Sequence, residues 1–185
     1  VAAVILKEQG YDVTCAFMRN WDALANNDIL GNPTIQDDVC PQEADYMDAK
    51  RVADRLGLEL LRVDFVKEYW DNVFTQFLDE YKKGRTPNPD ILCNKYVKFD
   101  AFFKFAMEQG FDLVATGHYA RVSNEGETKL LRGSDENKDQ TYFLCQVPVH
   151  ALAKTLFPIG DLAKPEVRRI ADEWELAVAK KKDST

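Results

Sequence analysis

The sequence predicts an α/β fold built on a doubly wound parallel sheet, because short apolar runs alternate with segments of helical periodicity. Three apolar runs are predicted strands, at residues 12–18, 58–65 and 111–116. The last of these is a near-continuous apolar stretch of the kind that parallel sheets bury on both faces. Strands and helices in this alternating order imply right-handed crossovers, which place helices on both faces of the sheet.

Helices are predicted between and around these strands. Residues 1–10 have the pattern of the end of an amphipathic helix, and residues 44–56 form a helix that Gly57 ends. Residues 69–81 carry apolar side chains at helical spacing, and a further helix is predicted over residues 93–107. The side chains expected in the core are Met47, Val52, Ala53 and Leu56 of the second helix, and Trp70, Val73, Phe74, Phe77, Leu78 and Tyr81 of the third.

The pattern changes in the C-terminal third of the chain. Residues 119–122 and 129–132, joined by the polar run SNEGET, predict a β-hairpin. The remainder is predicted to be helical, with a helix over residues 164–176 that opens at a proline, which the first turn of a helix tolerates. Residues 20–38, rich in Asn, Asp, Gly and Pro, are predicted to form a long mobile loop. No repeat or linker divides the chain, so residues 1–185 are predicted to form one domain.

The composition is that of a soluble globular domain, with 45% hydrophobic and 30% charged residues among 185. No apolar run approaches the roughly 20 residues that a membrane-spanning helix needs, and the N-terminus has no pattern of a secretory signal. The formal charge of −7 argues against a nucleic-acid binder driven by charge alone. Four cysteines without a C-x-x-C pair fit neither a zinc ribbon nor a disulfide scaffold, which favours a reducing compartment.

One run of residues predicts a reactive site. The segment GRTPNPDILCNK at residues 84–95 contains two prolines that stiffen a loop, and it presents Asp90 and Cys93 in a fixed relation. We expect Cys93 to lie at a helix start, where unpaired amide groups and the nearby Lys95 and Lys98 favour the thiolate. The alternative is that Cys93 is a small buried apolar residue of the core.

A nucleotide site is predicted at one edge of the sheet. Ligands of doubly wound sheets bind beyond the carboxyl ends of the strands, where this chain places Phe17, Met18, Gly117 and His118. Neither the P-loop pattern nor G-x-G-x-x-G occurs in the sequence. The alternative for His118 is a structural role, as a histidine of the core whose ring is hydrogen-bonded within the protein.

Several motifs together resemble one family. GRTPNPDILCNK is followed by ATGHYAR at residues 115–121, LLRGSDENKDQTYFL at 130–144 and AKKKDST at 179–185, while FMRNWD and YWDNVF precede it. In this order and spacing the motifs closely resemble the tRNA-specific 2-thiouridylases, and they extend over essentially the whole chain. The resemblance implies a Rossmann-like catalytic domain of the PP-loop ATP pyrophosphatase type.

The resemblance also implies a reaction. ATP, with Mg²⁺, adenylates the C2 oxygen of the wobble uridine in a tRNA, and a cysteine persulfide then supplies sulfur to give 2-thiouridine. The implied partners are tRNA and a persulfide sulfur-donor protein, with no membrane. The implied location is the bacterial cytoplasm, with the mitochondrial matrix as the alternative.

The family's functional residues carry over position by position. Cys93 matches the nucleophilic cysteine that pairs with the persulfide cysteine as a disulfide, and Asp90 is the implied proton carrier beside it. No protein ligand for the metal is implied. The other matched positions are Met18 and Gly117 for ATP, Asn88, Pro89 and Asp90 for the target base, and His118, Lys138, Asp139 and Gln140 for the tRNA.

Two pieces of the family pattern do not occur in these 185 residues. They are the phosphate-binding signature Ser-Gly-Gly-x-Asp-Ser and the persulfide cysteine, and the family's C-terminal tRNA-binding domains are also outside this sequence. Cys15 and Cys145 are expected to pack in the core, and Cys40 is assigned no role. Two other functions stay open: a PP-loop adenylating enzyme of the amide-forming type, and a nucleotide- or RNA-binding module without chemistry.

Overall fold

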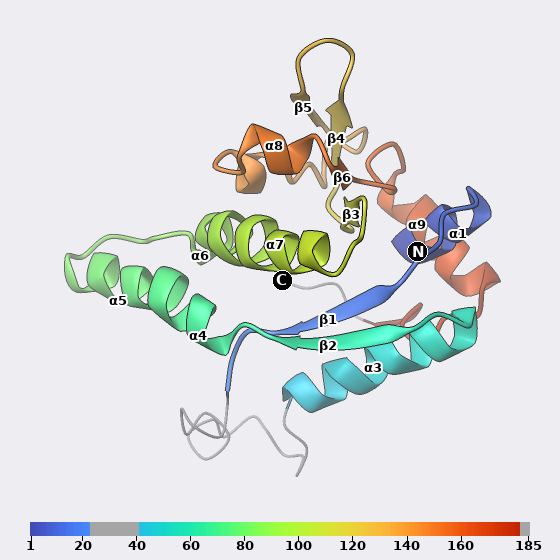
Figure 1. Cartoon of the computed structure of the whole chain (residues 1–185), viewed down its shortest axis with the longest axis horizontal. Helices are drawn as coiled ribbons and strands as arrows, with labels where there is room; N and C mark the ends of the chain where they lie inside the picture. The colour runs from blue at the N-terminus through green and yellow to red at the C-terminus, as the bar shows by residue number, and fades with distance from the viewer. Residues whose placement is uncertain (23–40, 182–185) are drawn as a thin grey trace.

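The computed structural model describes residues 1–22 and 41–181. Helices and parallel strand pairs alternate along the chain, which confirms the α/β class (Figure 1). Residues 23–38 of the predicted mobile loop lie outside the described residues, as do Cys40 and the end of the AKKKDST motif. Within the described residues, no helix combines the length and apolar character needed to cross a bilayer.

Within residues 1–22 and 41–181, the strands form three two-stranded sheets. Two of the pairs are parallel, as predicted, and the third is the predicted antiparallel hairpin. One continuous doubly wound sheet is not formed by the described residues. The pairs are β1 (Cys15–Arg19) with β2 (Leu60–Asp64), β3 (Val114–Ala115) with β6 (Thr155–Leu156), and β4 (Ala120–Ser123) with β5 (Lys129–Arg132).

Two long helices are each assembled from three consecutive segments. In both, the middle segment is a π-helix, a rare form with wider turns that is frequent at functional sites. The first helix consists of α4 (Val66–Tyr69), the π-helix η1 (Trp70–Phe74) and α5 (Thr75–Lys82). The second consists of α6 (Pro89–Cys93), the π-helix η2 (Asn94–Ala101) and α7 (Phe102–Glu108).

The remaining helices are shorter or peripheral, and most were predicted within a few residues. Helix α3 (Pro41–Leu56) ends just before Gly57, as predicted. Gly57 has a positive φ of 66°, a conformation that glycine adopts without steric cost. These helices are α1 (Ala2–Glu8), α3 (Pro41–Leu56), the 3₁₀ turn η3 (Thr141–Leu144), α8 (Val149–Leu152) and α9 (Lys164–Glu173).

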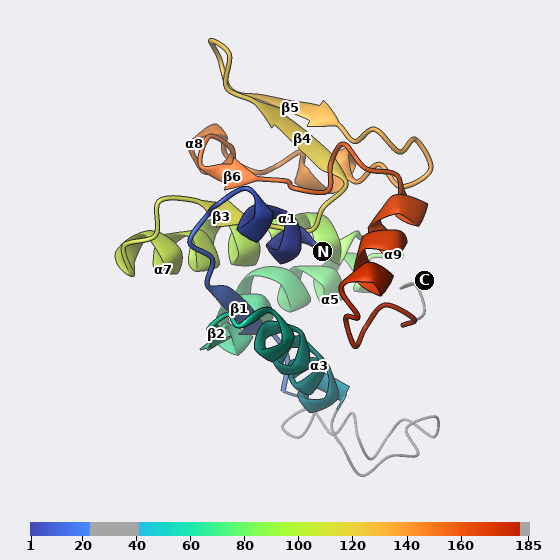
Figure 2. The same cartoon turned by 90° about the vertical axis from the view of Figure 1, so that its right-hand side faces the viewer.

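The β1–β2 pair separates two layers of helices (Figures 1 and 2). Phe17 lies opposite Arg62 in the register, and both contact Tyr46 of α3: the two rings are 5.4 Å apart and the guanidinium lies 4.5 Å from the Tyr46 ring. Met18 and Val63, the next pair along, pack instead against the helices on the opposite face. Because side chains alternate along a strand, a shift of one residue would exchange the two faces.

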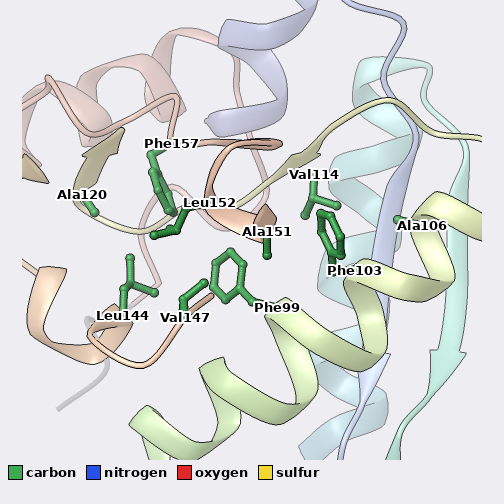
Figure 3. Close-up of a cluster of buried hydrophobic side chains, with 10 residues drawn as sticks. All are labelled: Phe99, Phe103, Ala106, Val114, Ala120, Leu144, Val147, Ala151, Leu152 and Phe157. Carbon is green, nitrogen blue, oxygen red and sulfur yellow. The ribbon is translucent and has the colours of Figure 1, made fainter. Parts of the chain in front are cut away.

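The largest core cluster joins η2 and α7 to the C-terminal half of the chain. Phe99 is fully buried and points from η2 into side chains of η3, α8 and the segment after β6 (Figure 3). The cluster consists of Phe99, Phe103, Ala106, Val114, Ala120, Leu144, Val147, Ala151, Leu152 and Phe157.

His118 is packed at the edge of this cluster. Its ring centroid is 6.1 Å from that of Phe99 and 6.2 Å from that of Phe157, and its Nδ1 is hydrogen-bonded to Thr116 Oγ1 at 2.7 Å. Burial, followed by the charge of Lys98, lowers the pKa of His118 to about 3. The imidazole is therefore neutral at physiological pH.

Several expected core positions are wrong. Of the apolar positions predicted for residues 69–81, only Val73 is buried, while Trp70 is 41% and Tyr81 67% exposed. The helix lies at the edge of the molecule, so only one side of it is covered (Figure 1). Met47 and Cys145 are also exposed, and Cys15 is only partly buried.

One predicted strand is shorter than expected, and one short strand was not predicted. The predicted strand at 111–116 contains only the two paired residues of β3, and Leu113 is exposed. Strand β6 lies in a part of the chain predicted to be helical, and its two residues are too few to give a periodic signal.

Two glycines allow loops of the C-terminal half to approach β4. A Cβ on Gly160 would lie 1.9 Å from the carbonyl oxygen of Ala120, and one on Gly133 would lie 2.7 Å from that of Tyr119. Both neighbours are backbone atoms, which a side-chain rotation cannot move aside. The approach of these loops to β4 therefore requires glycine at both positions.

Replacing Gly160 by alanine should destabilise the fold. The added methyl group must displace backbone, which costs about 1–3 kcal/mol in a packed interior, and each 1 kcal/mol lowers the melting temperature by about 2–4 °C at this size. Thermal unfolding followed by circular dichroism measures the effect. Gly117→Ala is the matched control, because its Cβ would meet nothing within 4 Å. Equal melting temperatures for the two variants would contradict the close approach at Gly160.

Stability should fall on acidification through His118. With a folded pKa of about 3, His118 binds no proton at pH values where the unfolded chain, with a pKa near 6.5, does. Between these values unfolding takes up a proton, so stability is lost by up to about 1.4 kcal/mol per pH unit as the pH falls. Denaturant unfolding of the wild type and His118→Gln at a series of pH values measures the slope. The variant should show a shallower slope, and an unchanged slope would contradict a neutral, partly buried imidazole in the folded state.

Candidate active site around Cys93

The proline-bracketed loop ends in a capped helix. Asn88 is the N-cap of α6: its Oδ1 accepts a hydrogen bond of 3.0 Å from the backbone N–H of Asp90, and Pro89 opens the first turn. The helix therefore begins four residues earlier than expected, so that Cys93 lies one turn inside it. The side-chain oxygen of Asn88, matched to target-base contact, is used here as the cap.

The thiol of Cys93 is buried. Only 9% of the residue is exposed, and it packs with Phe65, Val73 and Val97. Burial raises the pKa of the Cys93 thiol above its ordinary value, Lys98 opposes this rise, and the nearby Asp90 adds to it. The expectation of an exposed, activated thiolate at a helix start is therefore wrong for this structure, because the helix starts at Pro89 and carries Cys93 into the core.

Asp90 lies at the outer end of this cluster. Its side chain is exposed in the first turn of α6, yet its charge reaches both Cys93 and the hydroxyl of Tyr69. Burial raises the pKa of Tyr69, and Cys93 and Asp90 raise it further. Tyr69 is thus a neighbour of the thiol that sequence reasoning treated only as the first residue of a helix. The YWDNVF motif was the available signal.

Met18 and Cys93 are brought together. Met18, near the carboxyl end of β1, packs against the cluster that contains Cys93, although 75 positions separate them in the sequence (93 − 18). Gly117 follows the carboxyl end of β3, is exposed, and has open space where a Cβ would stand. An apolar side chain and an open stretch of backbone at strand ends fit the flat face and the edge of an adenine ring.

The Lys138–Asp139–Gln140 trio is largely engaged within the chain. Desolvation opposes ionisation of Asp139, but hydrogen bonds from Thr141, the Gly133 amide and Arg132 lower its pKa to about 2. Gln140 exchanges two hydrogen bonds of 3.0 Å with the backbone of Tyr119, the residue after His118. Asp139 and Gln140 thereby fix the loop next to His118, and Lys138 is exposed beside them.

Asn94 ties the Cys93 helix to this loop. It is 2% exposed, and its Nδ2 donates a hydrogen bond of 3.2 Å to the carbonyl oxygen of Phe143 in η3. Within residues 1–22 and 41–181, its Oδ1 has no hydrogen-bond partner. Sequence reasoning missed Asn94, because a single asparagine inside a helix gives no periodic or motif signal of its own.

The comparisons with known proteins agree with one another over the whole chain. The family profile described as the tRNA methyl transferase HUP domain matches residues 1–185. The proteins named tRNA-specific 2-thiouridylase MnmA from Mycoplasma capricolum subsp. capricolum, Mesoplasma florum and Acholeplasma laidlawii are 59%, 60% and 58% identical to the chain. Each alignment covers 100% of this chain and 50% of the relative, so the chain spans about half the length of these curated relatives.

These findings confirm the resemblance that the motifs indicated. The relatives carry the name of the thiouridylases, and a HUP domain implies a Rossmann-like α/β fold, in agreement with the parallel pairs β1–β2 and β3–β6. Because the profile matches every residue from 1 to 185, the chain belongs to the tRNA methyl transferase HUP domain family.

Proposed function

We propose that this chain is the catalytic domain of a tRNA 2-thiouridylase, which uses ATP to adenylate the C2 oxygen of the wobble uridine before a persulfide replaces that oxygen with sulfur. The observation that carries the proposal is the packing of Met18 and Cys93 in one cluster. This packing supports the proposal because Met18 matches a position of ATP contact in the family and Cys93 matches the nucleophile. Asp90, matched to the target base, is close enough to Cys93 to influence its pKa.

ATP supplies the adenylyl group that turns the C2 oxygen into a leaving group, with Mg²⁺ balancing the triphosphate charge. Met18 and Gly117 are the residues proposed to hold the adenine. Asp90, an exposed carboxylate at the first turn of α6, is positioned to accept the N3 proton that the uridine loses as its C2 oxygen is modified. Asn88 and Pro89 fix the turn from which Asp90 projects.

Cys93 completes the sulfur transfer. Attack of the family's persulfide cysteine on C2 expels AMP and leaves a disulfide between that cysteine and the sulfur bound to C2. The Cys93 thiolate then attacks the sulfur atom of the persulfide cysteine, which releases 2-thiouridine and leaves a disulfide between Cys93 and the persulfide cysteine. An external thiol reduces that disulfide and returns both cysteines to the thiol state.

The proposed partners are tRNA and a persulfide sulfur-donor protein, and the proposed location is the bacterial cytoplasm. Two separate parts of the chain are proposed to contact the tRNA together, and a hydrogen bond between Gln140 and Tyr119, the residue after His118, holds them side by side. The residues proposed for this contact are His118, Lys138, Asp139 and Gln140. A neutral His118 offers the RNA a hydrogen-bonding ring without a charge. We also propose that β1–β2 and β3–β6 are parts of one doubly wound sheet in the full-length protein.

One observation favours a second candidate. The burial of Cys93 and the raised pKa of its thiol fit a plain packing residue, as in a PP-loop adenylating enzyme of the amide-forming type that needs no thiol. The high identity to proteins named thiouridylase over the whole chain favours sulfur transfer instead.

Cys93→Ser should abolish thiolation without abolishing activation of the tRNA. Serine lacks a sulfur that can attack the disulfide, whereas the residues proposed for ATP remain in place. The assay uses a full-length protein that contains this chain, with ATP, Mg²⁺, tRNA and a persulfide donor, and measures 2-thiouridine and pyrophosphate. Cys145→Ser, at an exposed cysteine outside the site, is the matched control and should retain both products. Thiolation by Cys93→Ser would contradict sulfur transfer through Cys93, and a wild type that releases no pyrophosphate with tRNA would contradict the proposed function altogether.

Asp90→Asn should reduce turnover by about 100-fold or more, because the amide cannot accept the proton. The melting temperature should change little, since the carboxylate is exposed and forms no part of a core cluster. Single-turnover thiolation and thermal unfolding of the same preparation separate the two effects. Wild-type turnover, or a large fall in melting temperature, would refute this role for Asp90.

A further inference from the structure

The helix that carries Cys93 widens immediately after that residue. Cys93 is the last residue of α6 and the flanking residue of the π-helix η2. A π-helix pairs each residue with the fifth one along, whereas an α-helix pairs it with the fourth. Lys98, five positions after Cys93, therefore lies one turn above it. In a regular α-helix the same residue would be rotated away by about 140°.

Lys98 lies between two buried positions of the helix. Its two neighbours in sequence, Val97 and Phe99, are both fully buried, and the Phe99 ring contacts that of His118. Lys98 itself is partly buried, and no carboxylate of the described ranges 1–22 and 41–181 forms an ion pair with it. An anion that forms beside this ammonium during the reaction completes an ion pair with it.

None of the other charged and titratable groups that the described residues place around the thiol is a cation that stabilises the Cys93 thiolate. Asp90 faces Cys93 from α6 and disfavours a thiolate, Tyr69 faces it from α4 with a raised pKa, and His118 beyond Lys98 is neutral. Lys95 is turned toward an aromatic ring, with its ammonium 4.7 Å from the centroid of Tyr96. Lys98 is the cation that lowers the pKa of Cys93 against the effect of burial, and it also lowers the pKa of His118.

We propose that Lys98 is the charge partner of the Cys93 thiolate, and that the π-helical turn of η2 is the feature that brings its ammonium over the thiol. This rests on the proposed function, in which the Cys93 thiolate attacks a disulfide. It adds to that reaction a residue that offsets the cost of ionising a buried thiol. The sequence analysis expected Lys95 and Lys98 alike to favour the thiolate, but the proposal assigns this role to Lys98 alone.

The test measures the ionisation of Cys93 directly. In a full-length protein that contains this chain, alkylation by iodoacetamide is followed from about pH 6 to about pH 10, because the thiolate is the reacting form. Mass spectrometry resolves the rate at each cysteine, so that the exposed Cys145 is an internal reference. The variants are Lys98→Met, Lys98→Arg and, as matched control on the same helix, Lys95→Met.

Lys98→Met should shift the alkylation curve of Cys93 upward by about one pH unit, which lowers its rate near neutrality about tenfold. Lys98→Arg should restore most of the rate, Lys95→Met should match the wild type, and Cys145 should react equally in all of them. Coincident Cys93 curves for Lys98→Met and the wild type, or equal shifts in Lys98→Met and Lys95→Met, would overturn the proposal. A Lys98-dependent curve in a protein whose Cys93→Ser variant still thiolates tRNA would leave the ion pair standing and remove only its catalytic use.

Discussion

The structure of the candidate site depends on one packing arrangement, in which β1 and the Cys93 helix share an apolar cluster. Met18 and Val63, paired in the parallel register, present their side chains to the face on which Val73, Cys93 and Val97 are buried. The neighbouring strand positions face α3 on the other side, so the period of two along the strands decides which residues meet the thiol. Met18 and Cys93, which are distant in sequence, thereby belong to one apolar packing arrangement.

The same packing creates the chemical difficulty of the site. A thiol inside an apolar cluster is held in its protonated form, which is the unreactive one. The charge of Asp90 raises the pKa of the thiol further, whereas the charge of Lys98 in η2 lowers it.

Sequence patterns predicted the elements whose periodicity extends over several residues. The hairpin, α1, α3, α9 and the parallel pairing of β1 with β2 all follow from such patterns. The two-residue strand β6 and the π-helical segments do not, because neither leaves a repeating apolar signal. The sequence predicted the burial of Cys93 only as the alternative. The helix starts at Pro89 because Asn88 caps it, and that cap depends on side-chain geometry that the sequence does not show.

Motif resemblance identified the family correctly, and the structure adds which motif residues form hydrogen bonds within the chain and which are exposed. Asp139 and Gln140 hold a loop beside His118, while Asp90 remains exposed at the first turn of α6. The most direct test of the account replaces the wobble uridine of a substrate tRNA by 4-thiouridine and maps its photo-crosslinks to the full-length protein in the presence of ATP. We expect crosslinks to the segment from Asn88 to Lys98, next to Met18. Crosslinks confined to the β4–β5 hairpin or to α9, with none in that segment, would contradict it.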